Sequence, residues 1–263
     1  MTTAEIIKHA DVFLLDMDGT VYFDDAPIGS MAETLTTLRR AGKKLVFFTN
    51  NSSKTPDEYE KKLKRIGLWG AGDLVYTSAM ATIEYLSEFY PGKPVYLVAT
   101  DAVKAEFAAA GVPLTEEDPA ICVLAYDTTL TFEKLKKINK FIAEGALYIA
   151  THPDDVCPSK DVFPPDVGSF IALLKVSSGK TPAVICGKPF TVMGDCIKRR
   201  MKASADRVVM VGDRLHTDIR FGVNNGFHTI LVLSGETKEE DLASSPDRPE
   251  GVLPSLNDAV KYL

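Results

Sequence analysis

The sequence predicts an α/β protein built on a parallel sheet with helices on both faces. Short runs of consecutive apolar and β-branched residues alternate along the chain with segments of helical periodicity. Strands that are apolar at every position are typical of parallel sheets, because both of their faces are buried. Their alternation with helices indicates βαβ units. The 263 residues suffice for one large domain or two smaller ones.

The first third of the chain shows this alternation. Buried strands are expected in the segments VFLLD, KKLVFFTNN and LVYTSA. The intervening APIGSMAETLTTLRRAG predicts a loop and a helix, with Ser30 as N-cap, Glu33 completing a capping box and Gly42 beyond the end. The segment TPDEYEKKLKRIG predicts a further helix, with Thr55 as N-cap and Pro56 in its first turn.

The middle of the chain starts a second series of β-α units. PGKPVYLVATDAVKAEFAAAGV is one unit, and AICVLAYDTTLTFEKLKKINKFIAEGALYIAT is another that ends in a strand. A long polar loop and a helix follow, after which RVVMVGDRLHTDI and HTILVLSGETKEEDL resume the first style. We therefore expect a discontinuous sheet domain, residues 1–85 and 184–263, interrupted by an α/β domain at residues 86–183.

Composition and charge exclude several classes of protein. The formal net charge is -6 and the isoelectric point is about 5.3, without a Lys/Arg-rich run that would suit a nucleic acid or an anionic membrane. The apolar runs are far shorter than the ~20 residues that span a bilayer, and the N-terminus does not resemble a signal peptide. The four cysteines form no CxxC pair and are expected to be reduced thiols. We expect a cytoplasmic protein, with a homodimer left open.

Polar residues follow the expected strands of the first domain. Ligands of open parallel sheets bind at the carboxyl ends of the strands, so these residues should converge on one crevice. Lys188, within the segment GKP just after the inserted domain, can reach the same place from a loop or helix start. The residues at the strand ends are Asp16, Asp18, Thr49, Asn50, Asn51, Gly212 and Asp213.

Carboxylates gathered in this way repel one another. At ~4 Å and an effective dielectric of ~20, each like-charged pair costs on the order of 4 kcal/mol. Either the pKa values of the acids rise or a cation lies among them. Oxygen ligands without His or Cys favour Mg²⁺, which in turn favours a phosphate-bearing substrate. The Thr49 hydroxyl, the Lys188 ammonium and backbone amides are suitable partners for a phosphate dianion.

The two acids of the segment DVFLLDMDGTVYF are expected to have different roles. Asp16 closes a strand and is held rigidly, which suits a nucleophile that attacks phosphorus and forms an aspartyl-phosphate. Asp18 lies two residues further on, where it can protonate the leaving oxygen and later deprotonate water. Gly19 allows the tight turn, and Thr20 can donate a hydrogen bond within it.

Four segments closely resemble, in order, the four motifs of the haloacid dehalogenase (HAD) superfamily: DMDGT, TNN, GKP and GDRLHTD. The inserted domain resembles a C2 cap, and the best match is the NagD-like class IIA branch of phosphatases. The resemblance covers essentially the whole chain, and the four motifs together are far more specific than any one alone. It implies an HAD-like Rossmannoid core with an inserted α/β C2-type cap.

The resemblance also implies a role for each matching residue. Asp16 matches the nucleophile and Asp18 the general acid and base. Mg²⁺ would be bound by the Asp16 side chain, the Asp18 backbone carbonyl and Asp213. Thr49 and Asn50 match the phosphate-binding second motif.

Three further residues lie in the third and fourth motifs. Lys188 matches the lysine of the third motif. Asp218 matches the second acid of the fourth motif and is expected to support the site rather than to ligate the metal. His216 stands where relatives carry other residues and remains a candidate without an assigned role. The remaining histidines, His9, His152 and His228, are expected to be ordinary surface or core residues.

The loop THPDDVCPSKDVFPPDVGS matches the specificity loop of the family, and its candidate residues are Asp154, Cys157, Lys160 and Asp166. Cys157 stands where pyridoxal phosphate phosphatase has a His, which argues against that substrate. Asp166 suggests hydrogen bonds to the hydroxyls of a sugar or nucleoside, with helix capping as the alternative.

These observations predict a Mg²⁺-dependent phosphomonoesterase that acts on a small phosphorylated metabolite and accepts p-nitrophenyl phosphate as an artificial substrate. A phosphotransferase or mutase of the same superfamily is one alternative. A phospho-accepting module like a receiver domain is another, but receivers are short and carry the accepting Asp on a middle strand. They also lack a general acid like Asp18.

Overall fold

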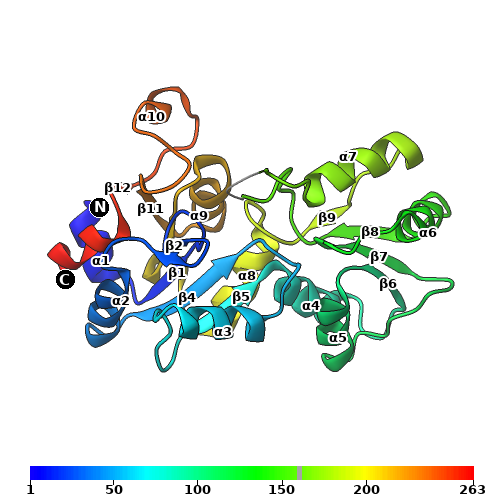
Figure 1. Cartoon of the computed structure of the whole chain (residues 1–263), viewed down its shortest axis with the longest axis horizontal. Helices are drawn as coiled ribbons and strands as arrows, with labels where there is room; N and C mark the ends of the chain where they lie inside the picture. Colours follow the sequence, from blue (N-terminus) through cyan, green and yellow to red (C-terminus); the bar gives the residue numbers. More distant parts are fainter. Residues whose placement is uncertain (159–161) are drawn as a thin grey trace. The chain divides into compact units, whose positions relative to one another are not determined.

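The structure is a computed structural model that describes residues 1–158 and 162–263. The chain divides into two compact units, each with its own sheet (Figure 1). Unit 1 comprises Met1–Thr49, Pro56–Tyr76 and Lys188–Leu263, and unit 2 comprises Asn50–Thr55 and Thr77–Gly187.

Unit 1 is built on a six-stranded sheet in the order β12-β11-β10-β1-β4-β5. Its strands are β1 (Val12–Leu15), β4 (Lys44–Thr49), β5 (Leu74–Thr77), β10 (Val208–Gly212), β11 (His228–Val232) and β12 (Gly251–Leu253). The central strand β1 pairs in parallel with both β10 and β4, and every residue of β1 is buried. The predicted α/β class with buried parallel strands is confirmed. A short antiparallel pair, β2 (Tyr22–Phe23) and β3 (Ala26–Pro27), follows β1 and was not predicted.

The helices of unit 1 bury apolar side chains against this sheet. One core cluster combines residues of α1, α2, α3 and η3 with alternate residues of the strands, such as Phe13, Leu15 and Phe47. On the other face, Phe48 of β4 packs against Phe221 of α9 with ring centroids 5.3 Å apart. The bounds are α1 Thr3–His9, α2 Met31–Arg40, α3 Pro56–Arg65, α8 Thr191–Met201, η1 Ala205–Arg207, η2 Leu215–Ile219, α9 Arg220–Asn225, α10 Asp241–Ser244 and η3 Leu256–Tyr262.

The start of α2 differs from the prediction in its hydrogen bonds. Ser30 occupies the N-cap position, but its side chain makes no capping hydrogen bond. The Ser30 hydroxyl instead donates to Asn257 Oδ1 at 3.4 Å, so the predicted capping box with Glu33 is not formed. A partner 227 residues away has replaced the local one.

Unit 2 contains a four-stranded sheet in the order β6-β7-β8-β9, with all neighbouring strands parallel. Its strands are β6 (Val95–Val98), β7 (Ile121–Leu124), β8 (Leu147–Ala150) and β9 (Val184–Ile185). Its helices are α4 (Ser78–Phe89), α5 (Asp101–Ala109), α6 (Phe132–Ala143) and α7 (Val167–Ser178). Helices α6 and α7 bury a shared cluster against the sheet, including Ile138, Phe141 and Leu174.

The limits of the units lie near, but not at, the domain boundaries expected from the sequence. The whole of α4 belongs to unit 2, and so does β9, because it pairs with β8. Residues 50–55 also belong to unit 2, although they directly follow a core strand of unit 1. The second predicted motif, TNN, is therefore divided between the two units after Thr49.

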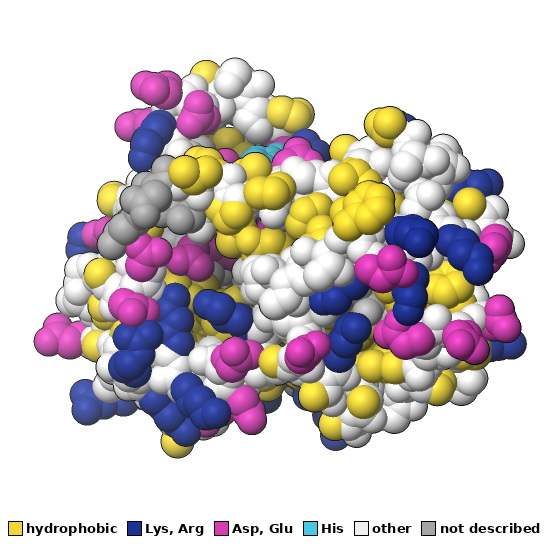
Figure 2. Space-filling model, turned by 45° about the vertical axis from the view of Figure 1, so that its right-hand side comes forward, with side chains coloured by type: hydrophobic (Ala, Val, Ile, Leu, Met, Phe, Trp, Pro, Cys, Tyr) yellow, Lys and Arg dark blue, Asp and Glu magenta, His cyan; other side chains and the backbone are white. Residues whose placement is uncertain are grey.

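The surface carries charges of both signs. On the face shown in Figure 2, Lys and Arg side chains are interspersed with Asp and Glu side chains. Among the described residues, no helix is long and apolar enough to cross a bilayer. All four cysteines are free thiols, as the sequence predicted.

Candidate active site

The turn after β1 places two carboxylates differently. The Asp16 backbone amide donates to the Val211 carbonyl at 2.9 Å, so Asp16 extends the pairing of β1 with β10. Asp16 is only 5% exposed, whereas Asp18 is exposed. Gly19 has φ +84°, and a Cβ at this position would lie 2.4 Å from Asp213 Oδ2. Both the backbone conformation and the close approach to Asp213 therefore require glycine here.

Asp213 directly follows β10 and is 3% exposed. Its Oδ2 accepts a hydrogen bond from the Glu236 backbone amide at 2.7 Å, and its Oδ1 accepts one from the Thr20 hydroxyl at 3.4 Å. The turn after β1 and the segment after β11 thus fix this carboxylate from two sides. The hydrogen bond from Thr20 was not part of the prediction, which placed that hydroxyl within its own turn.

Asp218 is fully buried on η2, the short helical segment that precedes α9. Its Oδ2 accepts a hydrogen bond from the Arg214 backbone amide at 3.1 Å. A Cβ at Gly212 would lie 2.3 Å from Asp218 Cγ, so only glycine allows η2 to come this close to the end of β10. The glycine of the GDRLHTD segment therefore positions the second acid of that segment.

Lys188 provides a fully buried ammonium group between two of the acids. Its Nζ lies 2.6 Å from Asp16 Oδ1 and 2.7 Å from Asp218 Oδ1. It also donates to the Phe48 carbonyl of β4 at 3.4 Å. An ammonium without water is tolerated only when its donors are paired, and these three acceptors satisfy it.

The ionisation of this cluster is strongly perturbed. Burial raises the pKa of Asp16 to about 8, which the charge of Lys188 opposes and the charge of Asp218 reinforces. Burial and the charge of Asp218 raise the pKa of Asp213 to about 6. Burial lowers the pKa of Lys188, but the charges of Asp16 and Asp218 more than reverse this and hold it above its usual range. The charge of Arg214 also favours the ionised forms of Asp16 and Asp213, yet both pKa values stay raised, so the cations among the described residues do not fully offset the burial of these acids.

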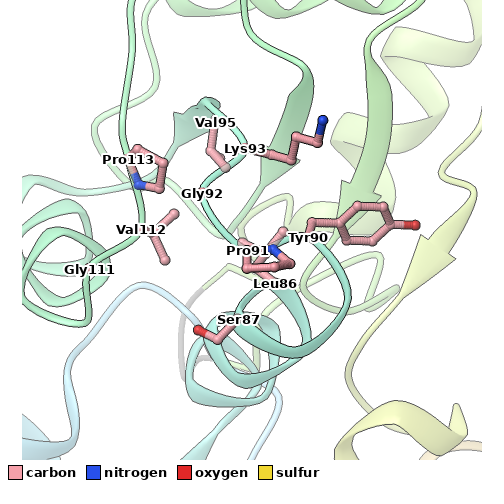
Figure 3. Close-up of a pocket in the computed structure, with 10 residues that line it drawn as sticks. All are labelled: Leu86, Ser87, Tyr90, Pro91, Gly92, Lys93, Val95, Gly111, Val112 and Pro113. Atoms are coloured by element: carbon pink, nitrogen blue, oxygen red, sulfur yellow. The ribbon is translucent and has the colours of Figure 1, made fainter.

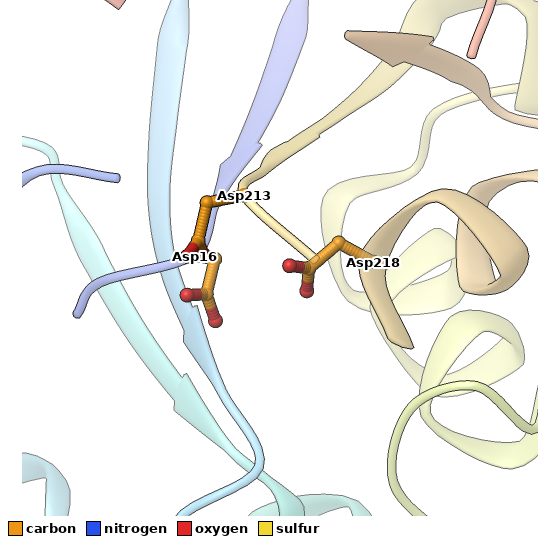
Figure 4. Close-up of side chains that lie close together, drawn as sticks. All are labelled: Asp16, Asp213 and Asp218. Atoms are coloured by element: carbon orange, nitrogen blue, oxygen red, sulfur yellow. The ribbon is translucent and has the colours of Figure 1, made fainter. Parts of the chain in front are cut away.

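The three carboxylates face a common space (Figure 4). One oxygen each of Asp16, Asp213 and Asp218 can be chosen so that all three lie within 4.8 Å of one another, and all three residues are buried. No described residue donates a hydrogen bond to Asp16 Oδ2. An oxygen-only set with surplus negative charge fits a hard divalent cation.

The structure brings most of the predicted core residues together. Asp16, Asp213, Asp218 and Lys188 form the cluster described above, and Thr49 ends β4, the strand next to β1. Asn50, in unit 2, is 3% exposed and its Nδ2 donates to Asp154 Oδ1 at 2.9 Å. The structure gives the positions of these residues, and their chemical roles stay predictions.

The predicted specificity residues occupy different environments within unit 2. Asp154 and Cys157 are half-buried, and Cys157 Sγ lies 3.8 Å from Asn51 Nδ2. Asp166 is only 3% exposed and is the N-cap of α7, where its Oδ1 accepts from the Val167 amide at 2.6 Å. Lys160 lies outside the described residues. In unit 1, His216 is exposed on η2.

The sequence analysis assigned no specific role to one residue that the structure shows to be buried. His152, treated there as an ordinary core or surface residue, is 0% exposed and lies just beyond β8. Its Nε2 is 3.0 Å from Asp166 Oδ1. The position of His152 after a buried strand is the same signal that pointed to Asp16 and Asp213.

Unit 2 also has a hollow of about 160 Å³ near the end of α4, shown in Figure 3. Tyr90, Val95 and Pro113 are among its lining residues. Val95 is the first residue of β6, so the hollow lies at the amino end of that strand. Ligands of parallel sheets bind at the opposite end, and the hollow is therefore not part of the candidate site.

Family comparisons agree with this geometry. The family of haloacid dehalogenase-like hydrolases matches residues 13–113, and an HAD-hydrolase-like family matches residues 185–259. The chain is 33% identical to an acid sugar phosphatase from Staphylococcus epidermidis over 98% of this chain and 99% of the relative.

Two solved structures are also similar over nearly the whole chain. A 4-nitrophenylphosphatase from Thermotoga maritima has a TM-score of 0.94 and 41% identity, covering 97% of this chain and 98% of its own. A glycerol phosphate phosphatase from Mycobacterium tuberculosis, solved in complex with magnesium, has a TM-score of 0.89 and 29% identity, covering 97% of this chain and 77% of its own.

A shared fold and a similar sequence over this length define the class: the chain belongs to the haloacid dehalogenase-like hydrolases. The resemblance carried by the four sequence motifs is confirmed. Within the family, the chain is a phosphatase of the NagD-like branch.

Proposed function

We propose that the protein is a Mg²⁺-dependent phosphomonoesterase that hydrolyses a small phosphorylated metabolite, such as a sugar phosphate or a nucleotide, through an aspartyl-phosphate. The observation that carries this proposal is the buried cluster of Asp16, Asp213 and Asp218 around Lys188. The similarity to an acid sugar phosphatase supports the substrate class.

The side chains of Asp16 and Asp213, with the backbone carbonyl of Asp18, would hold Mg²⁺. Their oxygen donors and the surplus negative charge of the cluster fit this ion. Asp218 has one oxygen paired with the Lys188 ammonium and the other with the Arg214 amide, whereas Asp213 accepts from two neutral donors, which favours a supporting role for Asp218. When bound, the ion supplies positive charge that counters phosphate–carboxylate repulsion and orients the phosphate.

The two acids of the β1 turn divide the chemistry. Asp16 attacks phosphorus through the carboxylate oxygen that Lys188 does not hold, and the bond from phosphorus to the ester oxygen breaks. Asp18 donates its proton to that leaving oxygen and then takes one from the water that attacks phosphorus. The bond between phosphorus and the Asp16 oxygen then breaks, which releases inorganic phosphate and restores the Asp16 carboxylate. Asp18 is exposed, where a leaving group can reach it, whereas buried Asp16 is held in place by β1.

Thr49, Asn50 and Lys188 would bind the phosphate. Thr49 offers a hydroxyl donor at the end of β4, Asn50 is its neighbour in the chain, and Lys188 brings an ammonium that contacts Asp16. Neutral donors and one cation suit a phosphate dianion that arrives with a metal ion.

Unit 2 would act as a C2-type cap that selects the leaving group. Its loop after β8 contains Asp154, Cys157, Lys160 and Asp166, the candidates for this selection, and His216 of unit 1 is a further one. A cap that closes over substrate excludes water and contacts the part of the ester that the core motifs do not recognise.

A phosphate-release assay with p-nitrophenyl phosphate tests the proposal. Activity should depend on added Mg²⁺, disappear with EDTA and return when Mg²⁺ is restored. Ca²⁺ should substitute poorly, because it favours more ligands and longer bonds than Mg²⁺. Full turnover by a demonstrably metal-free preparation would contradict the proposal.

We also propose a cytoplasmic location, with small phosphate esters rather than nucleic acids or membranes as partners. A fluorescent fusion and a binding assay with nucleic acid and vesicles test these two points. A homodimer is the assembly to look for by light scattering.

A further inference from the structure

The buried imidazole of His152 has a hydrogen-bond partner for each of its nitrogens. Its Nε2 lies 3.0 Å from Asp166 Oδ1, and its Nδ1 lies 3.0 Å from the Thr151 hydroxyl. A carboxylate oxygen only accepts, so Nε2 carries the proton and donates it. In the neutral ring Nδ1 then accepts, and its donor is a hydroxyl group.

Proton counting identifies that donor. The Ser78 hydroxyl also lies near Nδ1, at 3.4 Å, but it donates its one proton to the Asn50 carbonyl. The Thr151 hydroxyl is the nearest to Nδ1, at 3.0 Å, whereas the Ser52 hydroxyl lies 3.5 Å from Nδ1 and the Leu124 carbonyl lies 3.4 Å from the Thr151 hydroxyl. Thr151 is therefore the donor to His152.

The chain of hydrogen bonds continues in one direction. Because the Thr151 proton goes to His152, its oxygen accepts from the Ser52 hydroxyl at 2.9 Å. The Ser52 oxygen in turn accepts from the Tyr126 backbone amide at 2.9 Å. The sequence of donors is thus Tyr126 amide, Ser52, Thr151 and His152, and it ends on Asp166. Each hydroxyl donates once and accepts once.

The two ends of this chain are at functionally distinct loops. Ser52 lies in residues 50–53, the loop that begins with Asn50, whereas Asp166 closes the predicted specificity loop at the start of α7. A second contact joins the same loops, because Asn50 Nδ2 donates to Asp154 Oδ1 at 2.9 Å. All of these residues belong to unit 2.

Asn50 and His152 also pack closely against Gly187. A Cβ at Gly187 would lie 2.6 Å from Asn50 Oδ1 and 2.9 Å from His152 Cβ. The glycine of the GKP segment thus lets Asn50 and His152 pack against the chain just before Lys188. The Gly187 amide also donates to the Thr151 carbonyl at 2.7 Å.

We propose that His152 is a positioning residue, which with Asp166 and Thr151 locks the phosphate loop, residues 50–53, to the base of the specificity loop and so sets the affinity for phosphate. The proposal rests on the proposed function, because it takes Asn50 as a phosphate ligand. In this proposal His152 acts on the loop through Thr151 and Ser52, and it is not itself a ligand of substrate or metal.

The test compares variants that break the chain with one that preserves it. His152→Leu and Asp166→Ala each remove a link, whereas Thr151→Ser keeps the hydroxyl that donates to Nδ1. Binding of inorganic phosphate is measured by calorimetry with saturating Mg²⁺, and KM and kcat with p-nitrophenyl phosphate. The first two variants should raise the phosphate Kd and the KM about tenfold, the size that one lost hydrogen bond gives. Their kcat should change less than about threefold, and Thr151→Ser should stay within about twofold of wild type in all three.

Leu174→Ala is the matched control for stability. Leu174 is fully buried on α7, and its truncation leaves a cavity in the core of unit 2 without touching the hydrogen-bond chain. It should lower the Tm and leave the phosphate Kd unchanged. A His152→Leu protein that only lowers the Tm, with a phosphate Kd within twofold of wild type, would overturn the proposal. If His152→Leu does not fold, Asp166→Ala decides by the same criterion.

Calorimetry also separates this proposal from the proposed function. If the wild-type protein binds phosphate but hydrolyses no ester, the function fails and the role of His152 is still measured. If the wild-type protein turns over substrate and the variants bind phosphate normally, the role of His152 alone fails. In the double variant, His152→Leu with Asp166→Ala, the losses should not add, because both remove one chain.

Discussion

The carboxyl ends of the two parallel sheets carry buried polar residues of different character. In unit 1, Asp16 and Asp213 follow β1 and β10, and the Lys188 ammonium contacts Asp16 and Asp218. In unit 2, Thr151 and His152 follow β8 and belong to a chain in which every donor has an acceptor. The same strand-end position thus holds an unbalanced charge cluster in one unit and a closed hydrogen-bond chain in the other.

The comparison shows two different consequences of burying polar side chains at the end of a strand. Buried carboxylates with too few partners are costly, and the cost is reduced by binding a cation or by transferring a proton. A fully satisfied polar chain has no such tendency and instead fixes the geometry of the loops that it joins. The unit 1 edge is therefore built to react and the unit 2 edge to position, and the following predictions test this contrast.

The largest effect is expected from Asp16→Asn. The amide retains the shape of the side chain but is a far weaker nucleophile, and phosphate-ester hydrolysis is very slow without catalysis. Turnover of p-nitrophenyl phosphate should fall by at least ~10⁴-fold while the protein remains folded by circular dichroism. A well-folded variant that keeps a tenth of the wild-type kcat would show that another group attacks phosphorus.

Asp18→Asn should have a smaller effect that depends on the leaving group. General acid catalysis contributes about 10²–10⁴-fold when the leaving oxygen needs a proton. The loss should therefore be large for an alkyl phosphate and markedly smaller for p-nitrophenyl phosphate, whose leaving group is stable as an anion. Measuring kcat for both esters with wild type and variant decides the point; equal losses would remove Asp18 from the role of acid.

The core of the fold and the members of the acidic cluster could be predicted from the sequence, because the rule that connects them is local. A buried parallel strand predicts where the next residues lie, so the sequence alone was enough to place Asp16 and Asp213 at one edge of the sheet. Lys188 could be added because it follows the inserted domain closely and offers the counter-charge that a phosphate needs. Their catalytic roles go beyond this placement and remain predictions.

Features that depend on distant partners could not be predicted. The Ser30 hydroxyl meets Asn257 rather than completing its local capping box, and nothing in the MAETL segment signals this. The two-residue strand β9 is too short to show a pattern, so its pairing with β8 was missed. The His152–Asp166 pair spans 14 residues across a polar loop, with no periodicity to connect them.

Asp213→Asn should stabilise the metal-free protein. Burial and the charge of Asp218 raise the pKa of Asp213 from 3.8 to about 6, so its ionisation in the folded state costs roughly 3 kcal/mol at neutral pH. In EDTA, the variant should melt about 5 °C above wild type at pH 8. A carboxyl whose pKa is higher in the folded protein lowers its stability most at pH values above the folded pKa, and it has no effect at pH values below the unfolded pKa. The difference in Tm between the two proteins should therefore vanish toward pH 4.

Added Mg²⁺ is the control for this comparison. It should raise the Tm of the wild-type protein, by binding only the folded state, and raise that of Asp213→Asn much less. Calorimetric melting with and without the ion measures both effects. Equal melting temperatures for the two proteins in EDTA at pH 8 would mean that ionised Asp213 does not destabilise the metal-free folded protein.

The smallest effect is expected at Cys157, on the loop of unit 2. Its half-buried thiol lies 3.8 Å from Asn51 Nδ2, within the loop that we propose selects the leaving group. Cys157→Ala removes one contact, so relative kcat/KM values across a panel of phosphorylated metabolites should change by a few-fold, toward the low end for one altered group in a pocket. Cys122→Ala is the matched control, because this thiol is fully buried in β7 and burial raises its pKa to about 12. Cys122→Ala should lower the stability of the protein and leave the ranking of substrates unchanged.

An unchanged ranking with Cys157→Ala would contradict the prediction. The exposed His216 would then be the next candidate, and unit 1 would contribute to substrate selection as well as to chemistry.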